Sequence, residues 1–349
     1  MHLQDSAPRF PHPHFPDSWY AVSWSHELKP AIALPIRAFG QDLVAFRKSD
    51  GSVHVLAAHC PHLGAHLGHG GTVVDDQLRC PFHGWRFDPT GRCTLAPSTL
   101  TVPKVKALQT WMTRELHGRI WIWFSNTDAP PTWNLPETLL DPAVQWKTAG
   151  QFARSFASHP QDIMENAVDA DHFRFVHGMS EVLFAETAYT EHGLATDLKV
   201  RSKSDRLGFK GFVFNLDITD RVYDMGLQTI HSVIWHPKLP FKLSTLVVES
   251  LVPREVGQVD FLIDIHMSAL PIAGFDWLAH RSFRRAVEAD VDSDIQVWAH
   301  RRYLARPQLT AVDTEIGGYR RWAKRFYPPV LPGASRAVAQ NSADPAAAA

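Results

Sequence analysis

Four residues with metal-binding side chains occur in two short, similar patterns. Cys60-x-His62 is followed, after seventeen residues, by Cys80-x-x-His83. Each pattern offers one thiolate and one imidazole, which are ligands of zinc and of iron–sulfur centres. Zinc modules usually group their cysteines in C-x-x-C pairs, whereas a [2Fe–2S] centre with two cysteines on one iron and two histidines on the other needs one ligand of each kind from each loop. The alternation therefore favours an iron–sulfur cluster.

A second group of possible ligands follows later in the chain, in the pattern Asp169-x-x-His172-x4-His177. In a helix, Asp169 and His172 would share a face at i and i+3. The two histidines are five residues apart, which is about 140° around an ideal helix. Both can reach one metal only if the helix loosens, and Gly178 directly afterwards is consistent with that. Without further context, two ordinary histidines on a helix would be the simpler interpretation.

A mononuclear iron site with open coordination positions needs a carboxylate beside two histidines. The helix predicted over Phe275–Tyr303 carries four acidic residues, namely Glu288, Asp290, Asp292 and Asp294. Its apolar stripe contains Phe283, Val287 and Trp298. At about 100° per residue, Asp294 lies within about 40° of this stripe, Asp290 within about 40° of Asp294, and Asp292 nearly opposite. A carboxylate on an apolar stripe is costly unless it is paired or binds a metal, so Asp294 and Asp290 are the candidates.

The stretch Cys60–Cys93 resembles the Rieske iron–sulfur domain in its residue types as well as in their spacing. Its run C-P-F-H-G-W, followed by D-x-x-G-x-C, is typical of Rieske oxygenases. The resemblance implies that Cys60 and Cys80 hold one iron of a [2Fe–2S] cluster, while His62 and His83 hold the other. Imidazole is neutral where thiolate is negative. Histidine ligation therefore raises the reduction potential, and the iron on the solvent side is the one through which electrons enter and leave.

The resemblance covers about residues 18–330 and includes the second group of ligands. It implies that His172 and His177 bind a mononuclear Fe(II). The run D-I-Q-V-W that begins at Asp294 looks like the D-I-x-x-W stretch whose Asp is the third iron ligand in steroid-type Rieske oxygenases. We therefore expect Asp294 to complete the site, with Asp290 as the reserve.

Rieske oxygenases are usually homotrimers, because the cluster of one chain is too far from its own mononuclear iron and serves the neighbouring chain. A carboxylate bridges the two histidine ligands across the interface. By resemblance, this catalytic carboxylate is Asp169, between His83 of one chain and His172 of the next. Alternatively, Asp169 only orients His172 as a hydrogen-bond acceptor. The two roles are compatible.

The elements that position these residues fall into two regions. Up to Arg119–Phe124 the predicted strands are short, and turn signals such as Ser49–Ser52 separate them, which indicates an all-β domain. Beyond the Pro-rich segment Asn126–Pro136 the pattern changes. There we predict helices over 162–176, 275–303 and 319–327, and strands over 211–222, 229–234 and 258–266. Mixed helices and an antiparallel sheet indicate an α+β fold.

Together with the resemblance, these patterns predict the domain organisation. We expect an N-terminal arm (1–17), an all-β Rieske [2Fe–2S] domain (18–130), a helix-grip-like catalytic domain with the mononuclear iron (131–330) and a disordered tail (331–349).

Composition excludes several classes of protein. Among 349 residues, 45% are hydrophobic, which excludes wholesale disorder. A balance of 35 basic and 36 acidic residues argues against nucleic-acid binding through bulk positive charge. Three cysteines cannot form a disulfide framework. No apolar run approaches the roughly 20 residues that span a bilayer, and the N-terminus lacks the apolar core of a signal peptide. We expect a cytoplasmic protein without a membrane span and without a nucleic-acid partner.

The resemblance implies the terminal component of a monooxygenase, which uses O2 and electrons that arrive from outside. No G-x-G-x-x-G run lies between a predicted strand and a predicted helix, so the chain has no visible nicotinamide or flavin fingerprint. Electrons from NAD(P)H must therefore come through a separate flavin reductase, a ferredoxin or both.

The stretch from Trp298 to Tyr327 resembles the 3-ketosteroid 9α-hydroxylase and cholesterol 7-desaturase branch. It departs from that branch where Asp313-Thr314-Glu315-Ile316 replaces the usual Asp-Gly-Pro. The resemblance implies hydroxylation of a steroid or a similar bulky apolar molecule. Aromatic O- or N-demethylation and arylamine oxygenation are the alternatives. A Rieske electron-transfer protein without oxygenase activity is the alternative from another class.

Overall fold

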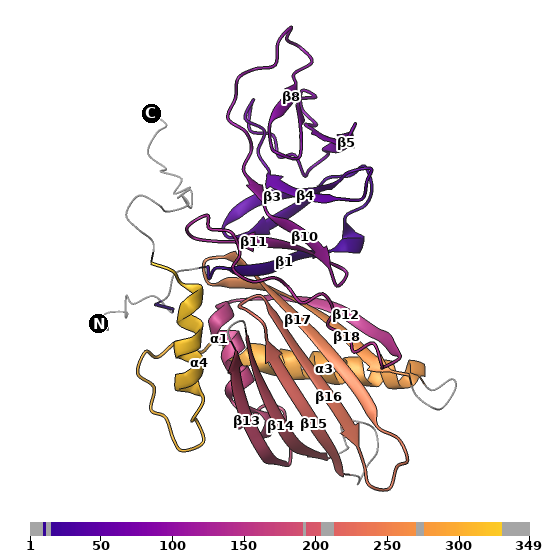
Figure 1. Ribbon diagram of the computed structural model, residues 1–349, viewed down its shortest axis with the longest axis vertical. Coiled ribbons are helices and arrows are strands. Elements are labelled where there is room, and N and C mark those ends of the chain that lie inside the picture. Colours follow the sequence, from indigo (N-terminus) through magenta and orange to yellow (C-terminus); the bar gives the residue numbers. More distant parts are fainter. Residues whose placement is uncertain (1–9, 12–14, 191–192, 204–212, 270–275, 330–349) are drawn as a thin grey trace, which may run out of the picture.

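The computed structural model describes residues 10–11, 15–190, 193–203, 213–269 and 276–329. Within them the chain forms an all-β region that ends at Phe124 and a second region in which one long helix crosses a large sheet (Figure 1). The α+β fold with an antiparallel sheet, expected from the sequence, is confirmed.

Short strands build the first region, because turns interrupt its apolar runs every few residues. The elements are β1 (Ser18–Trp24), η1 (Ser25–Glu27), β2 (Leu34–Ala38), β3 (Gln41–Arg47), β4 (Val53–Ala57), β5 (Thr72–Val74), β6 (Gln77–Arg79), β7 (Arg86–Phe87), β8 (Cys93–Leu95), β9 (Thr110–Trp111), β10 (Thr113–Leu116) and β11 (Arg119–Phe124). They form three sheets with the strand orders β1-β11-β10, β2-β3-β4-β9 and β5-β6-β7-β8. The turn predicted at Ser49–Ser52 is confirmed, and it joins β3 and β4, which pair antiparallel.

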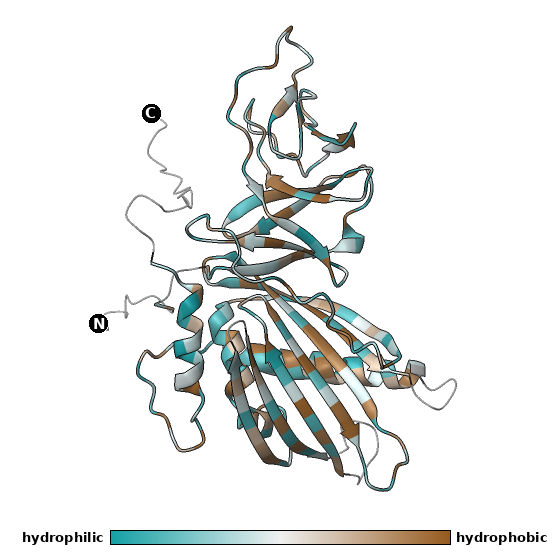
Figure 2. Ribbon diagram, viewed as in Figure 1, coloured by the Kyte–Doolittle hydropathy of each residue, from teal (hydrophilic) through white to brown (hydrophobic). Residues whose placement is uncertain are grey.

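The second region is built on one seven-stranded antiparallel sheet. Its strands are β12 (Trp146–Phe156), β13 (Glu181–Thr190), β14 (Gly193–Lys203), β15 (Val213–Val222), β16 (Leu227–Trp235), β17 (Leu243–Glu255) and β18 (Gln258–Ser268). They pair in the order β12-β18-β17-β16-β15-β14-β13. Apolar and polar residues alternate along much of this sheet (Figure 2), as expected where the two faces of a strand have different surroundings. The helix α3 (Asp276–Trp298) crosses one face (Figure 1).

Strand β17 is covered on both faces, which explains why its residues from Thr245 to Pro253 are buried without interruption. Val247 and Leu251 point toward α3 and share a hydrophobic core with its residues Val291 and Trp298. Leu246 and Val248 point the other way, into a second core that contains Trp19 and Trp121 of the first region, on β1 and β11. The first region therefore packs on the sheet face opposite α3.

Buried polar contacts reinforce this junction. Arg119 Nη2 lies 2.7 Å from Asp264 Oδ2, and both side chains are buried. The same carboxylate accepts a hydrogen bond of 2.9 Å from Trp24 Nε1, and Arg119 Nη2 also donates to the main-chain oxygen of Val248 (3.1 Å). A buried ion pair that is also hydrogen-bonded fixes geometry, because removing one partner leaves a buried charge. These contacts and the shared apolar core join the two regions.

The segment predicted as one helix over 162–176 is broken into three pieces, so this prediction was wrong. The pieces are α1 (Pro160–Met164), η2 (Glu165–Val168) and α2 (His172–Phe175). Between η2 and α2 the backbone of Asp169 is extended, with φ −100° and ψ 90°. The helix α2 ends at Phe175, between the two histidines, so the angle of a regular helix does not hold His172 and His177 apart.

The long helix ends earlier than predicted. It stops at Trp298 instead of Tyr303, and Arg301 beyond it pairs with Asp162 and Glu165. The helix predicted over 319–327 is α4 (Ile316–Ala323) followed by η4 (Lys324–Phe326).

Some predictions fall on parts of the chain that are not described. These parts include residues 211–212, Phe275, most of the arm 1–17 and the tail 331–349. The predicted domain boundaries therefore stay predictions. None of the described helices is long and apolar enough to cross a membrane.

Candidate metal centres

The two Cys/His loops are built alike. In each loop a glycine four residues after the cysteine has a positive φ, +75° at Gly64 and +70° at Gly84. Each glycine N–H donates to the carbonyl oxygen of its cysteine, at 2.9 Å for Cys60 and 3.2 Å for Cys80. A side chain at either glycine would strain the turn, because L-residues rarely adopt this conformation. The repeated spacing in the sequence thus encodes two equivalent turns.

The loops separate their ligands by burial. Cys60 and Cys80 are each only 2% exposed, whereas His62 and His83 are exposed. The two imidazole rings lie beside each other, with centroids 4.7 Å apart. Burial raises the pKa of the Cys60 thiol to about 11, and the neighbouring Cys80 adds to this effect. Bound iron would stabilise the thiolate form that burial disfavours, so the sulfur side fits a metal and the imidazole side faces solvent.

Trp85 has a defined place at this site. Its ring stacks on His62 with centroids 4.7 Å apart and an angle of 6° between the planes. The tryptophan is itself buried in the core beneath the loops. It therefore holds one imidazole in position and shields the ligands from one side.

The second ligand group comes together as one compact site. Among the described residues, His172, His177 and Asp294 are the one set of three or more His, Cys, Asp or Glu side chains whose ligand atoms lie within 4.8 Å of one another. Two imidazoles and one carboxylate suit a mononuclear Fe(II) with open positions.

Burial prepares this site for a divalent cation. It lowers the pKa of His172 to about 4, with the nearby His177 as a second cause, so the imidazole is neutral and able to bind metal. Burial also raises the pKa of Asp294 to about 7. A cation placed between these groups would favour the carboxylate. The donor set therefore fits the mononuclear iron.

Asp169 holds His172 through two contacts. Its carboxylate Oδ1 accepts the main-chain N–H of His172 (3.3 Å), and its main-chain oxygen is in close contact with Nδ1 of the same ring. This arrangement leaves Nε2 for the metal. It is what the orienting role requires, while the bridging role depends on a second chain and stays a prediction.

Asp290 and Asn166 have roles that the sequence did not reveal. Asp290 Oδ1 lies 3.5 Å from His177 Nδ1, while Asp294 Oδ2 lies 3.4 Å from Nε2 of that ring. Asn166 Nδ2 donates to Asp294 Oδ1 (3.5 Å). The reserve candidate Asp290 is thus placed to orient a histidine. The sequence held one indication of this role, because Asp290 lies four residues before Asp294 and therefore on the same side of the helix.

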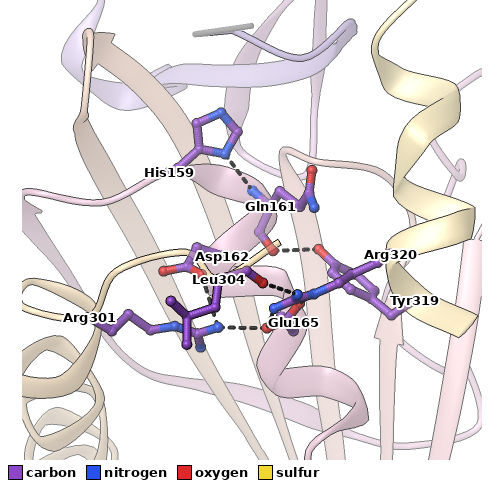
Figure 3. Close-up of polar contacts among 8 residues, drawn as sticks. All are labelled: His159, Gln161, Asp162, Glu165, Arg301, Leu304, Tyr319 and Arg320. Atoms are coloured by element: carbon purple, nitrogen blue, oxygen red, sulfur yellow. Dashed lines mark hydrogen bonds and ion pairs between the residues drawn. The ribbon is translucent and has the colours of Figure 1, made fainter. Parts of the chain in front are cut away.

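A buried ionic network supports the segment that carries the histidines (Figure 3). Glu165 pairs with Arg301 Nη2 and with Arg320 Nε, each at 2.6 Å. Arg301 also reaches Asp162 at 3.0 Å, and the Tyr319 hydroxyl donates to the main-chain oxygen of Gln161 (2.6 Å). The chain after α3 and the helix α4 therefore clamp α1 and η2, just before His172.

Comparisons with known families identify the chain. Residues 18–106 match the Rieske [2Fe-2S] domain, and residues 122–327 match the 3-ketosteroid 9alpha-hydroxylase C-terminal domain. The chain is a Rieske oxygenase. The oxidoreductase class, the Rieske cluster and the mononuclear iron predicted from the sequence are thereby confirmed as properties of the family. A Rieske electron-transfer protein without oxygenase activity is not supported. The individual ligand assignments stay predictions.

Individual relatives agree with this Rieske oxygenase family. Cholesterol 7-desaturase nvd 1 of Ciona intestinalis is 28% identical over 335 residues, which cover 90% of this chain and 69% of the relative. The oxygenase component of 3-ketosteroid-9-alpha-monooxygenase of Rhodococcus rhodochrous is 26% identical over 328 residues, with 90% and 84% covered. Dicamba monooxygenase bound to dicamba has the same fold, with a TM-score of 0.66, 17% identity, and 90% and 98% covered.

Proposed function

We propose that this Rieske oxygenase hydroxylates a bulky, largely apolar, steroid-like molecule with O2, using electrons that a separate ferredoxin, flavin reductase or both deliver from NAD(P)H. The observation that carries the proposal is the match of residues 122–327 to the C-terminal domain of a 3-ketosteroid hydroxylase. Relatives that align over 90% of the chain are named for cholesterol and for 3-ketosteroids.

The residues of this chain divide the work between two sites. When bound, the [2Fe–2S] cluster supplies single electrons and the mononuclear iron supplies open positions for oxygen. Cys60 and Cys80 would hold the buried side of the cluster, and His62 and His83 the side that exchanges electrons with partners. At the second site, the buried side chains of His177 and Asp294 would exclude bulk water.

A homotrimer is part of this proposal. In one chain the strands β5 and β8 beside the cluster loops and the helix α1 that precedes His172 lie in opposite halves of the molecule (Figure 1). An electron from His83 of one chain would therefore enter the next chain through Asp169, which contacts His172. Burial raises the pKa of Asp169, and a protonated or metal-bound histidine across the interface would favour its charged form.

Turnover of a substrate panel tests the proposal. Purified protein that contains the [2Fe–2S] cluster and the mononuclear iron is supplied with NADH, a surrogate ferredoxin and its reductase. The substrates are sterols, 3-ketosteroids and methoxyarenes. Mass spectrometry of the products separates the gain of one oxygen from desaturation and from loss of a methyl group. We expect oxygen insertion into a steroid. If the protein converts only methoxyarenes, the proposed hydroxylation is wrong and demethylation takes its place as the activity. The His172→Ala variant is the control for uncoupled chemistry.

A further inference from the structure

Two carboxyl side chains and one amide lie on the apolar face of the large sheet that α3 covers. Asp220 lies on β15, Gln228 on β16 and Glu249 on β17, and they are only 2%, 4% and 6% exposed. Gln228 is directly opposite Glu249 in the strand register. Their neighbours on the same face, Val222 and Val247, belong to the core that α3 completes.

The hydrogen bonds within this cluster are unequal. Gln228 Nε2 donates to both carboxylate oxygens of Asp220, at 2.8 and 2.9 Å. The carboxyl of Glu249 has no hydrogen bond or ion pair with any described residue, and no described cation pairs with Asp220. A buried carboxyl without a partner is unfavourable, because it has lost its hydrogen bonds to water and gained none from the protein. A bound molecule that supplies the missing hydrogen bonds is one explanation of such a group in a native protein.

Glu249 is not sealed by protein atoms. It does not belong to the fully enclosed polar groups that lack a partner, although nine-tenths of the residue is buried. The oxygens of its unpartnered carboxyl therefore adjoin accessible space inside the region that α3 covers. A molecule in that space could satisfy them.

The cluster lies next to the mononuclear centre. Val247 and Leu251, which flank Glu249 on the same face of β17, share one core with Val291 and Trp298. These two residues lie about one turn before and after Asp294 on α3. Glu249 and the proposed iron ligand therefore face each other across the layer between sheet and helix.

The surroundings favour the uncharged form of Glu249. Burial raises its pKa well above the ordinary value, and the carboxylates of Asp220 and Asp294 act in the same direction. A neutral carboxyl can donate one hydrogen bond and accept others. An alcohol or a ketone would satisfy it, whereas a hydrocarbon would leave it unpaired. An ammonium group would need the charged form that burial disfavours.

We propose that Glu249, supported by Gln228 and Asp220, is the polar anchor of the substrate site, where it binds an uncharged hydroxyl or carbonyl oxygen of an otherwise apolar molecule. The contact fixes which carbon of the substrate lies beside His172, His177 and Asp294. This inference rests on the proposed function and adds the part of the substrate that the protein recognises.

Paired ligands that differ in one oxygen test the anchor. The probes are androst-4-en-3-one and androst-4-ene, and their dissociation constants for the metal-loaded protein are measured by quenching of tryptophan fluorescence. We expect the wild type to prefer the ketone by about 10- to 100-fold, because the hydrocarbon leaves a buried polar group unpaired. In Glu249→Leu the preference is expected to fall below about threefold, with binding of the hydrocarbon kept. Glu249→Gln still donates and accepts, so it is expected to retain much of the preference.

Controls separate the anchor from a purely structural role. Glu186→Gln removes a carboxylate from the exposed face of β13 and is expected to leave the preference unchanged. Iron content and the Rieske spectrum report whether each variant is folded. With the ketone, Glu249→Leu is also expected to yield a broader mixture of oxidised positions, which a change in stability alone would not produce.

Other outcomes would overturn the inference. A ketone preference that survives in Glu249→Leu, while the wild type oxidises the steroid, would leave the proposed function standing and remove the anchor. Tighter binding of a 3-amino analogue than of the ketone would make the cluster a cation site instead. If the protein converts methoxyarenes but no steroid, the proposed substrate class is wrong. A hydroxylated methoxyarene and its deoxy analogue then replace the steroids as probes, and equal affinities for these two would overturn the anchor as well.

Discussion

Each residue at the mononuclear centre is held by a second polar group. Asp169 contacts His172, Asp290 lies beside His177, and Asn166 donates to Asp294. Such contacts select the ring nitrogen that faces the metal and fix the orientation of the carboxylate. The centre is therefore arranged by the protein before any metal arrives.

Removal of a ligand tests the assignment of the mononuclear site. We expect His172→Ala and Asp294→Ala to lose the mononuclear iron and all turnover, while the visible spectrum of the Rieske cluster is unchanged. The reason is that the two ligand groups are separate. Metal analysis and absorption spectroscopy measure both effects. Loss of the cluster together with the iron would indicate misfolding and leave Asp294 without support.

Asp290→Ala provides the matched comparison on the same helix. This carboxylate lies beside His177 Nδ1 and is expected to orient the ring. We expect the variant to retain iron with an affinity lowered by about 10- to 100-fold. An iron-free Asp290→Ala protein at saturating Fe(II) would instead transfer the ligand role to Asp290.

Asp220 gives stability a defined dependence on pH. Burial raises its pKa to about 7 in the folded chain, from an ordinary value of 3.8. Between these values the folded state binds the proton more tightly than the unfolded state, so the free energy of unfolding falls as pH rises. Asp220→Asn removes this loss. We expect the variant to gain up to about 2 to 3 kcal/mol on the wild type between pH 5 and pH 8, measured by denaturant unfolding. A difference that is constant with pH would contradict the burial argument.

At the scale of elements, the turn between β15 and β16 makes a close backbone contact with the first region. A side chain at Gly226 would place its Cβ 2.0 Å from the main-chain oxygen of Trp19 on β1. Next to it, Asp224 accepts the Trp19 N–H (3.3 Å) and the Trp133 indole N–H (3.2 Å). Glycine is needed here for close approach of two backbones, not for an unusual φ.

Gly226→Ala therefore forces β1 away from the sheet. We expect the free energy of unfolding to fall by about 1 to 3 kcal/mol or more, because a backbone atom cannot move aside as a side chain can. Thermal unfolding measures the change. Gly317→Ala in α4 is the control, since its Cβ would approach only the flexible end of Arg321 at 3.4 Å. There alanine is expected to be neutral or stabilising by up to about 1 kcal/mol. Equal losses in both variants would contradict the contact argument.

Local spacing predicted much of the molecule, and tertiary contacts explain what it missed. The cluster loops could be recognised because each ligand pair lies within a few residues of chain. The inward face of α3 followed from helical phase. Strand β17 carries no period-two signal because both of its faces are buried. The break at Asp169 and the early end of α3 depend on partners far away in sequence, such as the pair Arg301–Glu165.

At the scale of the whole molecule, the bridging role proposed for Asp169 depends on the assembly of several chains and can be tested directly. Asp169→Asn keeps the size of the side chain but removes its charge. We expect the variant to retain both metal centres and the trimer, while turnover falls by about 100-fold. Single-turnover measurement of cluster oxidation would locate the defect in electron transfer. If the rate of cluster oxidation is the same as in the wild type, Asp169 does not bridge chains and only orients His172.

Mixed assemblies test whether electrons cross between chains. A Cys60→Ala chain lacks the cluster, a His172→Ala chain lacks the mononuclear iron, and each is expected to be inactive alone. Co-assembled, they are expected to recover part of the activity, because the cluster of one chain can serve the iron of its neighbour. No recovery in verified mixed trimers would mean that electrons travel within a chain.

The buried junction around Arg119 and Asp264 also bears on how an electron can be delivered. A cluster domain anchored through a shared core cannot swing between a docking position and a reaction position, as tethered carriers do. Within the proposed trimer, the cluster of one chain and the mononuclear centre of the next are then held at one separation, and transfer is limited by tunnelling instead of diffusion. We expect the rate from reduced cluster to mononuclear centre to be unaffected when glycerol raises the viscosity of the solvent. Only the arrival of the external reductase is expected to slow.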